Sequence, residues 1–552
     1  MKQFLTKNKT SLLLIAMIFI AGLLRFYNLN WGVPFYFHPD ERNIASAVSQ
    51  LRFPEQMNPH FFAYGSFPMY TIYFSGILMN FFSNFKFPIS NFQFQMINAI
   101  SFEQAILMSR FFSAVLSVLL IPLFYLIGKA LKDKNTGLLA AFLGASSVGF
   151  IQFAHFGTFE MWLTFFSLLL FYFVYNIALT GKLQWMVLSG IIMSMLLSIK
   201  VSSAVLLPLA PFAVFFYELK YATRAKKKKA LLISVAASFL LIFLSASTAL
   251  LFSPYALLDF QSFRSTIIYE SSVALGTLSV FYTQGFYDIP FPNVFQLVHI
   301  YPFLLNPLLT VVLPIAMITV LYQGLTKKDT GMLLVLIFFS ILFFSQSFFF
   351  AKWTRYIVPT LPFAYVTIAI FFSSPIKNKR LYFFMIGIFV FSVIYTLSFL
   401  IVVYTREDTR IAANKWAKKN IPQHAQMLSE VYDLGILPFN NNFPSITLFD
   451  FYNLDKNAQK KSELNMQLQT TDYIILPSQR ILKNRLINSK RYPDGNRFYK
   501  SLFNGSLGFQ KVYETPCDLL CKLVYIENPV FSLEETTSVF DRPTVYIFKK
   551  IK

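Results

Sequence analysis

Charged residues are scarce in this sequence. Only 13% of the 552 residues are charged, while 55% are hydrophobic; an average soluble domain has about a quarter of its residues charged. Phenylalanine alone occurs 67 times, which is more than the interior of a water-soluble protein of this size requires. The composition therefore excludes a soluble domain as the main body of the protein and indicates a chain that folds largely in lipid.

Cysteine is almost missing. The two cysteines, Cys517 and Cys521, are too few for a structural zinc site, and no histidine lies near them in the sequence. Their four-residue spacing fits a disulfide in an oxidising compartment and equally fits two ordinary thiols. The sequence leaves both interpretations open.

The formal charge of +22 does not indicate nucleic-acid binding. The lysines and arginines gather in short runs between apolar segments, such as Lys226–Lys229, Lys327–Lys328 and Lys377–Arg380. No basic face with interleaved base-stacking aromatics is found outside these runs. Cations confined to short loops are typical of the cytoplasmic side of a membrane protein, so we expect the bilayer, and no nucleic acid, as a partner.

Eleven segments are apolar enough to be transmembrane helices, each of which needs about 20 predominantly apolar residues. These segments, some at the short end of the range, lie near 11–27, 108–128, 136–154, 160–178, 183–199, 201–217, 230–251, 297–321, 330–350, 355–373 and 381–404. The first has no small-residue cleavage site before Arg25, which argues against a signal peptide. The sequence predicts a polytopic α-helical protein of the cell membrane with about 11 transmembrane helices.

The apolar stretch 67–82 decides the topology. Three lysines among the first nine residues place the N-terminus in the cytoplasm. If 67–82 crossed the membrane, the run Lys129–Lys134 and every later basic loop would lie outside. If it lies along the outer interface, all of these loops become cytoplasmic, so we interpret it as juxtamembrane. The C-terminus is then extracytoplasmic, and residues 28–109 form the first extracytoplasmic loop.

The character of the chain changes in its last quarter. Residues 405–552 are polar and contain no segment long enough to span a bilayer. Thr409–Asn420 has the pattern of an amphipathic helix, while Asp472–Pro477 and Thr544–Phe548 have the pattern of short buried strands. We therefore predict a transmembrane domain over 1–404 and a small extracytoplasmic α/β domain over 405–552.

Three carboxylates stand out in the outer segments. Asp40 and Glu41 follow His38 shortly after the first span, an arrangement suited to a general base or a metal site. The alternative is a solvated loop that merely contains acidic residues. Glu160 opens a span, where an ionisable side chain is costly and usually functional. A carboxylate favoured by the helix dipole is the simpler interpretation of Glu160, but we favour a function for it.

Three cations lie on the outer side, against the positive-inside bias. Lys200 stands between two spans with no room for a loop, either as a snorkelling lysine or as an anchor for an anionic head group. Lys352 and Arg355 pose the same question, and Arg355 has the planar guanidinium that clamps phosphate oxygens. Cations and carboxylates on one membrane face would suit a lipid-linked phosphosugar, whose phosphate needs cations and whose acceptor hydroxyl needs a base.

Several short motifs follow one another in order along residues 1–404. They are His38-Pro-Asp-Glu41, Asn58-Pro-His-Phe with Tyr64-Gly-Ser-Phe-Pro-Met-Tyr70, Ser109-Arg-Phe-Phe-Ser113, Gln152-Phe-Ala-His-Phe-Gly-Thr-Phe-Glu160, Ser198-Ile-Lys-Val201, Ser253-Pro-Tyr-Ala-Leu-Leu-Asp-Phe260 and Arg355-Tyr-Ile-Val-Pro359. In this order and spacing they resemble the GT-C membrane glycosyltransferases that use polyprenyl-phosphate sugars, the group containing protein O-mannosyltransferases and aminoarabinose transferases. The C-terminal domain matches this group only loosely.

The resemblance implies an inverting sugar transfer from a polyprenyl-phosphate carrier to an acceptor hydroxyl on protein, lipid or glycan, at the extracytoplasmic face. Asp40 would be the base, Glu41 would support it, and Glu160 would occupy a second acidic position that is usually aspartate in similar sequences. Lys200 and Arg355 would hold the lipid phosphate and stabilise it as leaving group. The substrate-binding positions implied by the resemblance are His38, His60, Tyr64, Arg110, His155, Lys200, Arg355 and Tyr356.

The resemblance requires no cofactor. Some relatives of this fold use a divalent metal ion, however, and His38, His155 and the carboxylates would bind one here. Two other functions remain open. A transporter or flippase of lipid-linked sugars would show inverted repeats and paired broken helices, which are not seen in the sequence. A catalytically inactive assembly partner would have no need of Asp40, Glu160 and Arg355.

Overall fold

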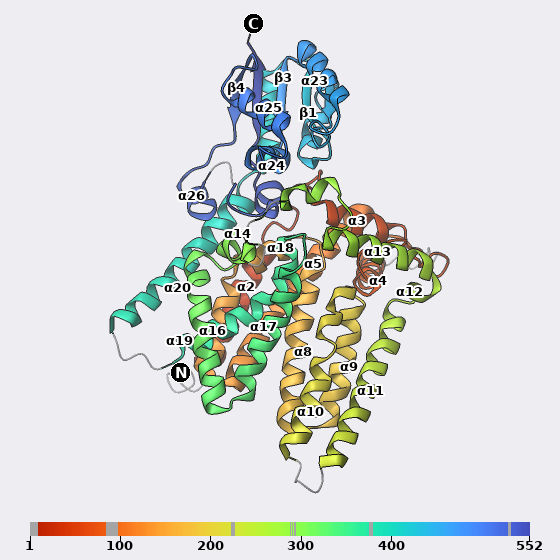
Figure 1. The fold of residues 1–552 in the computed structure, drawn as a ribbon, viewed down its shortest axis with the longest axis vertical. Helices are drawn as coiled ribbons and strands as arrows, with labels where there is room; N and C mark the ends of the chain where they lie inside the picture. Colours follow the sequence, from red (N-terminus) through yellow and green to blue (C-terminus); the bar gives the residue numbers. More distant parts are fainter. Residues whose placement is uncertain are drawn as a thin grey trace, which may run out of the picture.

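The computed structural model describes residues 9–83, 98–221, 227–287, 289, 291, 294–374, 379–527 and 531–551. It consists of a bundle of long helices and a small α/β domain stacked on one end of that bundle (Figure 1). We call this the domain-bearing end. Of the predicted basic runs, Lys2, Lys7, Lys226 and Lys377 lie outside the described residues.

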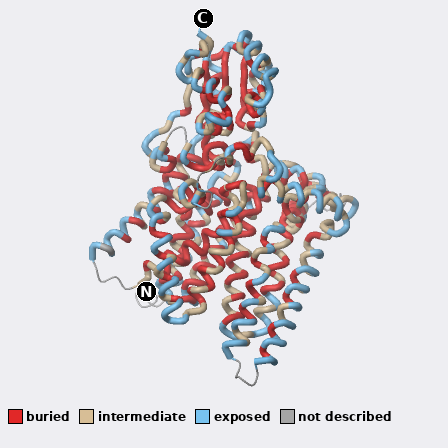
Figure 2. Tube along the Cα trace, viewed as in Figure 1, coloured by how far each residue is buried: buried red, intermediate tan, exposed pale blue. Residues whose placement is uncertain are grey.

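Nine spans in the described ranges are long and apolar enough to cross a membrane, and a bent pair makes a tenth. The nine are α2 (Lys9–Phe26), α5 (Phe102–Leu131), α8 (Glu160–Thr180), α10 (Leu209–Tyr221) with the 3₁₀ turn before it, α11 (Lys227–Phe252), α16 (Pro307–Lys327), α17 (Thr330–Ser347), α18 (Thr354–Ile357) continued by α19 (Leu361–Phe372), and α20 (Lys379–Leu400) with the turn after it. Side chains of α2 and α11 are mostly exposed, whereas the span that ends in α19 is mostly buried (Figure 2). The predicted fold class is confirmed.

The predicted span 136–154 is broken in two. It forms α6 (Lys134–Ala145) and α7 (Val148–His155), whose axes are bent by 50°. Ser146 ends the first helix, and the Ser147 hydroxyl accepts a hydrogen bond from an amide in the first turn of the second. Hydropathy does not detect this break, because capping depends on two small polar residues within an apolar run.

The predicted span 297–321 begins later than expected. Its first residues belong to two short helices, α14 (Phe295–His299) and α15 (Tyr301–Leu304). Asn306 has a φ of 87° and turns the chain, and its side chain accepts a hydrogen bond from the first turn of α16. Pro307 occupies the first position of α16, where its missing N–H costs nothing. The span therefore starts at Pro307.

Two further predicted segments, 183–199 and 67–82, form helices that are not among the nine spans. The predicted span 183–199 forms α9 (Leu183–Leu197), a helix of 15 residues that is shorter than a standard span and contacts α8 and α11. The stretch 67–82 forms α4 (Ser66–Ser83), which does not reach the apolarity of the nine spans. α4 contacts α3 (Pro39–Ser49), and Figure 1 shows both at the domain-bearing end, where α13 (Phe260–Leu275) also lies. This is the location expected of a juxtamembrane helix.

The α/β domain contains a five-stranded sheet of order β2-β1-β3-β5-β4. The strands are β1 (Met427–Glu430), β2 (Ile446–Phe449), β3 (Tyr473–Leu476), β4 (Phe509–Glu514) and β5 (Tyr546–Lys550). The helices around it are α21 (Thr409–Asn420), α22 (Leu437–Asn440), α23 (Ala458–Thr470), α24 (Arg480–Ile487), α25 (Pro493–Phe503) and α26 (Leu519–Tyr525). The predicted helix and both predicted strands are present. β1, β2 and β3 are parallel, and β5 is antiparallel to β3. Because the C-terminus after β5 lies at the far tip, the carboxyl ends of β1 and β3 face the helix bundle (Figure 1).

The two parts are joined by buried polar contacts and by α26. The Gln152 amide donates a hydrogen bond of 2.6 Å to Asp541, and the Thr354 hydroxyl donates one of 2.5 Å to Glu534. Cys517 and Cys521 form a disulfide at the start of α26, which contacts α20. The disulfide interpretation, which the sequence left open, is thus the one the structure adopts.

Candidate functional site

Asp40 and Glu41 lie in the first turn of α3 but face different partners. Pro39 opens this helix, and acidic residues in its first turn interact favourably with the helix dipole. Successive residues of an α-helix point about 100° apart. Asp40 therefore faces Arg355, whereas Glu41 faces Arg110.

The Asp40 carboxylate and the Arg355 guanidinium form an ion pair with a hydrogen bond. Their side chains are 25% and 22% exposed, so the pair is accessible from one side. The Arg355 guanidinium carbon also lies 4.6 Å from the ring centroid of Trp353 and 5.6 Å from that of Tyr356. These contacts orient the guanidinium against a flat aromatic surface.

Lys200 reaches the same place from the turn between α9 and the next span. Its ammonium lies 4.8 Å from the ring centroid of Tyr356 and 5.3 Å from that of Tyr64. Burial lowers the pKa of Lys200, and the negative charge of Glu160 is the largest effect that opposes this shift. Lys200 and Arg355 therefore both lie close to the Tyr356 ring, forming a two-cation site near Asp40.

Glu160 begins α8 and is 1% exposed. Neither of its carboxylate oxygens has a hydrogen-bond partner among the residues that the structure describes. Its charge acts on Lys200, Tyr64 and His38. A buried carboxylate without a hydrogen-bond partner is costly, so the nearby positive charge of Lys200 is its main compensation.

The cations keep Asp40 ionised. Burial alone would raise the pKa of its carboxyl, but the charges of Arg355, His38 and Lys200, with a hydrogen bond from Arg355, together hold that pKa below its ordinary value. Glu270 of α13, by contrast, has its pKa raised by burial. Of these two carboxyl groups, Asp40 is the one held in the form that can accept a proton.

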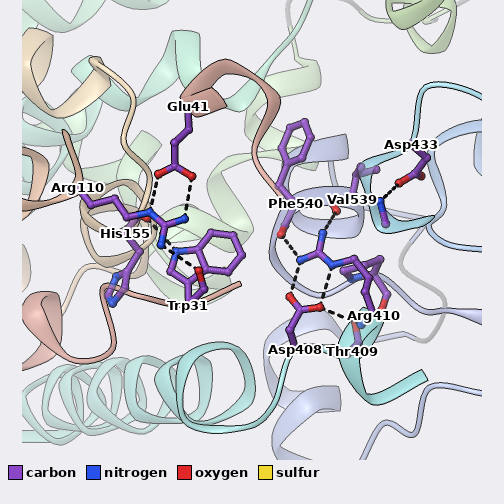
Figure 3. A network of polar contacts seen from close by, with 12 residues as sticks. Trp31, Glu41, Arg110, His155, Asp408, Thr409, Arg410, Asp433, Val539 and Phe540 are labelled. Atoms are coloured by element: carbon purple, nitrogen blue, oxygen red, sulfur yellow. Dashed lines mark hydrogen bonds and ion pairs between the residues drawn. The ribbon is translucent and has the colours of Figure 1, made fainter. Parts of the chain in front are cut away.

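Glu41 and Arg110 form a separate, fully buried pair. The Arg110 Nε donates to one Glu41 oxygen over 2.5 Å and Nη2 donates to the other over 2.8 Å. Arg110 also donates to the backbone carbonyl of Trp31, and Glu41 also accepts from the Gly157 amide. The pair thus ties the first loop, α3, α5 and the segment before Glu160 together. Figure 3 shows the two side chains facing each other, with Trp31 alongside.

His155 belongs to this structural network. Its ring nitrogens lie 2.8 Å from the carbonyl oxygens of Ile151 and Tyr27, and its ring stacks on Tyr404 at 3.7 Å. The sequence placed Glu41 among the catalytic residues and Arg110 and His155 among the substrate-binding ones. In the structure the polar groups of all three are engaged with other parts of the protein, and their roles in the reaction stay predictions.

The other predicted residues divide between the site and its margin. Tyr64 contacts Lys200, and His38 is buried between the rings of Phe156 and Phe540 beside Asp40, with burial lowering the pKa of its imidazole. His60 lies at the edge, with its side chain 60% exposed and its Nδ1 3.9 Å from Asp259.

Lys352 and Trp353 precede the ion-paired arginine. The Lys352 ammonium donates to the carbonyls of Ser347 and Phe349 at the end of α17, so it closes that helix and does not face the site. Trp353 was missed by the sequence reasoning, although an aromatic residue two positions before an outer arginine is a cation–π signal.

An apolar cavity of about 290 Å³ shares a wall residue, Tyr64, with the surroundings of Lys200. Its walls come from the loop before α4, the ends of α9 and α11, and α13. Tyr64 lines the cavity and its ring lies close to the Lys200 ammonium. Val201, which follows Lys200 in the chain, also lines it. Phe263 and Leu250 supply apolar surface further along. The cavity is therefore an apolar space on the other side of Tyr64, which also contacts Lys200.

The described side chains do not form the metal site that the resemblance allowed. His38 has an unpartnered Nδ1, and Glu160 has two unpartnered oxygens. Over the described ranges, however, no group of three or more His, Cys, Asp or Glu side chains is close enough to hold an ion. A metal would therefore need ligands from outside these side chains.

One protein-family model and several solved structures are similar to this chain. Residues 87–249 match the family model described as dolichyl-phosphate-mannose-protein mannosyltransferase. No curated protein sequence matches the chain significantly. The oligosaccharyltransferase of Archaeoglobus fulgidus, tethered to an acceptor peptide, superposes with a TM-score of 0.51 at 14% identity, over 99% of this chain and 89% of that one. The same archaeal enzyme, AglB, in complex with an inhibitory peptide and a dolichol-phosphate, gives 0.50 at 12% identity over the same shares.

A third similar structure is ArnT from Cupriavidus metallidurans bound to undecaprenyl phosphate, with a TM-score of 0.47 and 11% identity over 85% of this chain and 93% of that one. The predicted resemblance is confirmed by the family match and by the superposition on AglB. The chain is similar to the GT-C glycosyltransferases, and its fold is the GT-C fold of a multi-pass membrane protein.

Proposed function

We propose that this protein is a membrane glycosyltransferase that moves a sugar from a polyprenyl-phosphate carrier to an acceptor hydroxyl. The observation that carries the proposal is the Asp40–Arg355 ion pair with Lys200 on the same aromatic ring, Tyr356, while Tyr64 links Lys200 to an apolar cavity. A base, two cations and an apolar groove are the three components that such a reaction requires.

The donor phosphate binds Lys200 and Arg355. Arg355 has a planar fork for two phosphate oxygens, and Lys200 supplies a compact charge. The first isoprene units of the carrier enter the apolar cavity next to Tyr64. This arrangement places the anomeric carbon of the sugar near Asp40.

Asp40 accepts the proton of the acceptor hydroxyl as that oxygen attacks the anomeric carbon. The bond from the anomeric carbon to the phosphate oxygen breaks, and the polyprenyl phosphate leaves with the electron pair. Lys200 and Arg355 stabilise the added negative charge on the phosphate. Because a single displacement occurs, the anomeric configuration inverts.

The reaction takes place on the extracytoplasmic side in this proposal. Lys132, at the end of α5, donates to the carbonyl of Ile370 at the end of α19. That is the end of the bundle opposite Arg355, and Lys182 and Lys327 also lie at helix ends remote from the site. Basic loops favour the cytoplasm, so the N-terminus lies there and the domain-bearing end lies outside. A disulfide in the α/β domain suits that compartment.

The relatives support the donor class. The archaeal enzyme was solved with dolichol-phosphate and with peptides, and ArnT with undecaprenyl phosphate. We extend the lipid-phosphate carrier, which these proteins bind, to this chain.

The test is to incubate the purified protein with a panel of polyprenyl-phosphate sugars and to measure release of polyprenyl phosphate, with and without a chelator to detect a metal requirement. A flippase would move the lipid across proteoliposomes without cleaving it, and an inactive assembly partner would release nothing. Orientation is tested separately with an impermeant thiol reagent. The only two cysteines are joined, so one cysteine introduced at Lys461 is the sole thiol, and its protection from outside reagent would contradict the topology.

A further inference from the structure

A row of aromatic rings connects the α/β domain to the two cations. Tyr432 stacks on Phe281 at 4.5 Å between ring centroids, and Phe281 lies 5.1 Å from Tyr282. Tyr282 lies 6.0 Å from Trp353, which lies 5.4 Å from Tyr356. We call these five residues the aromatic row. It ends where the Trp353 and Tyr356 rings contact Arg355 and Lys200.

Tyr432, at the outer end of the row, is held in an unusual backbone conformation. It lies just after β1, and it is 62% exposed. Its φ is 60°, a backbone angle that residues other than glycine rarely adopt. Arg480 donates a hydrogen bond of 2.9 Å to its carbonyl oxygen and is itself ion-paired with Glu535. Backbone strain of this kind persists where surrounding contacts impose it, and it concentrates at functional sites.

Packing between the two parts of the protein does not account for Tyr432. Phe281 is already covered by the buried ring of Tyr452, at 5.0 Å. Removing Tyr432 would leave that contact in place. Its ring stacks on Phe281 while most of its own surface stays in solvent, so the outer end of the row presents open aromatic surface.

The side chains of the row are themselves uncharged, and hydroxyl groups lie along it. The hydroxyls of Tyr269 and Tyr282 are 2.9 Å apart and hydrogen-bonded, and Tyr269 is 41% exposed. Between Tyr432 and Trp353 every ring of the row is tyrosine or phenylalanine. Flat apolar faces with hydroxyls at their edges match a pyranose, which has an apolar C–H face and a rim of hydroxyl groups.

We propose that the aromatic row is the acceptor subsite and that the acceptor is a neutral saccharide. This inference rests on the proposed transfer reaction, because the row ends at the base that would activate the acceptor hydroxyl. An extended peptide is the alternative, and peptides are commonly held by pairing with a free strand edge. Tyr432 follows β1, which is paired with β2 on one side and β3 on the other. β1 therefore has no open edge on which a peptide strand could pair next to Tyr432.

The experiment uses the full chain and compares Tyr432→Ala with Tyr432→Phe. With the donor that the wild type cleaves, saccharide KM, donor KM and slow cleavage of the donor in the absence of acceptor are measured together. We expect Tyr432→Ala to raise the saccharide KM about five- to tenfold, the loss of one stacked ring, while donor KM and acceptor-free cleavage are unchanged. Tyr432→Phe retains the ring and should behave as wild type.

A matched control is Tyr513→Ala, which removes a tyrosine that packs against Trp416, 5.0 Å between ring centroids, within the same domain but outside the row. It should leave the saccharide KM unchanged. Transfer to a matched peptide in preference to the saccharide, or an unaltered saccharide KM in folded Tyr432→Ala, overturns the inference.

Failure of the proposed reaction has a different signature. If the wild type cleaves no donor, saccharide binding is measured directly by saturation-transfer NMR on a neutral oligosaccharide. A signal that is present with wild type and lost with Tyr432→Ala supports the subsite even then, whereas absence of any signal with wild type contradicts it.

Discussion

Arg355 is ion-paired with Asp40, so the guanidinium best placed to bind a donor phosphate also neutralises the carboxylate best placed to act as base. The two roles are in competition. When a phosphate takes the guanidinium, Asp40 loses its main counter-charge and becomes a stronger proton acceptor. In the reaction proposed above, this geometry would couple donor binding to activation of the acceptor hydroxyl.

Replacement of Asp40 by asparagine should abolish turnover without unfolding the protein. Loss of a general base typically costs roughly 10²–10⁴-fold in rate. Donor binding should be retained or strengthened, because Arg355 is released from its partner. The measurement is polyprenyl phosphate release together with a thermal unfolding curve. Asp259→Asn is the matched control, since Asp259 binds Asn58 and not Arg355; a normal rate in Asp40→Asn would exclude it as the base.

Replacement of Arg355 by glutamine should move the acid limb of the rate profile to higher pH. Asp40 must be ionised to act as base, so activity falls as the pH drops through its pKa. Burial raises that pKa, and Arg355 is the largest influence that lowers it. Without Arg355, burial is less opposed and the pKa rises. The pH dependence of kcat/KM is measured with donor well below its KM, because this parameter reports the pKa of the donor-free enzyme, in which Arg355 still pairs with Asp40. The control Arg264→Gln removes an exposed cation of α13 and should leave the acid side of the pH–rate profile unchanged. If Arg355→Gln and Arg264→Gln have the same acid side, Arg355 does not lower the pKa of Asp40.

Lys200 should make donor binding weaken with rising pH, and at a lower pH than an ordinary lysine would. Burial lowers the pKa of its ammonium, with Glu160 opposing the shift most strongly. Phosphate affinity is full below this lowered pKa and is lost as pH rises through it. Donor KM should therefore increase at a lower pH than an ordinary lysine would produce. Lys200→Gln should raise donor KM at neutral pH and remove the limb, and Glu160→Gln should move the limb to lower pH. A donor KM that stays flat in wild type up to the ordinary pKa of lysine would count against this role.

Glu41 should matter for stability rather than for chemistry. It is buried in a two-bond pair with Arg110, and removal of one partner from such a pair typically costs about 3–5 kcal/mol. Glu41→Ala should lower the unfolding temperature sharply, while the folded fraction retains most of its turnover. The double variant Glu41→Leu, Arg110→Met should be more stable than Glu41→Ala, because no charge is left unpaired. A loss of turnover like that of Asp40→Asn, in a fully folded Glu41→Ala protein, would assign Glu41 to the catalytic machinery instead.

The sequence by itself determined the membrane architecture, because hydropathy and cation placement are local properties. All eleven predicted segments contain helices, and the predicted helix and strands of the last quarter are where the pattern placed them. Lys200 and Arg355 were identifiable as functional candidates for the same reason, since each is a cation in a position that topology does not require. What hydropathy could not detect were caps within apolar runs, which broke one span at Ser147 and delayed another to Pro307.

Only the tertiary structure decided which carboxylate faces the cations. Asp40 and Glu41 are adjacent in the chain, and the rotation of α3 about its axis, which Arg110 and Arg355 hold from different sides, gave one of them a solvent-accessible pair and the other a buried one. The same holds for the aromatic row, whose members come from Tyr432, the Phe281–Tyr282 turn and the Trp353 segment. The contact of Tyr432 with Phe281 depends on how the α/β domain is docked on the bundle, and no local pattern encodes that orientation.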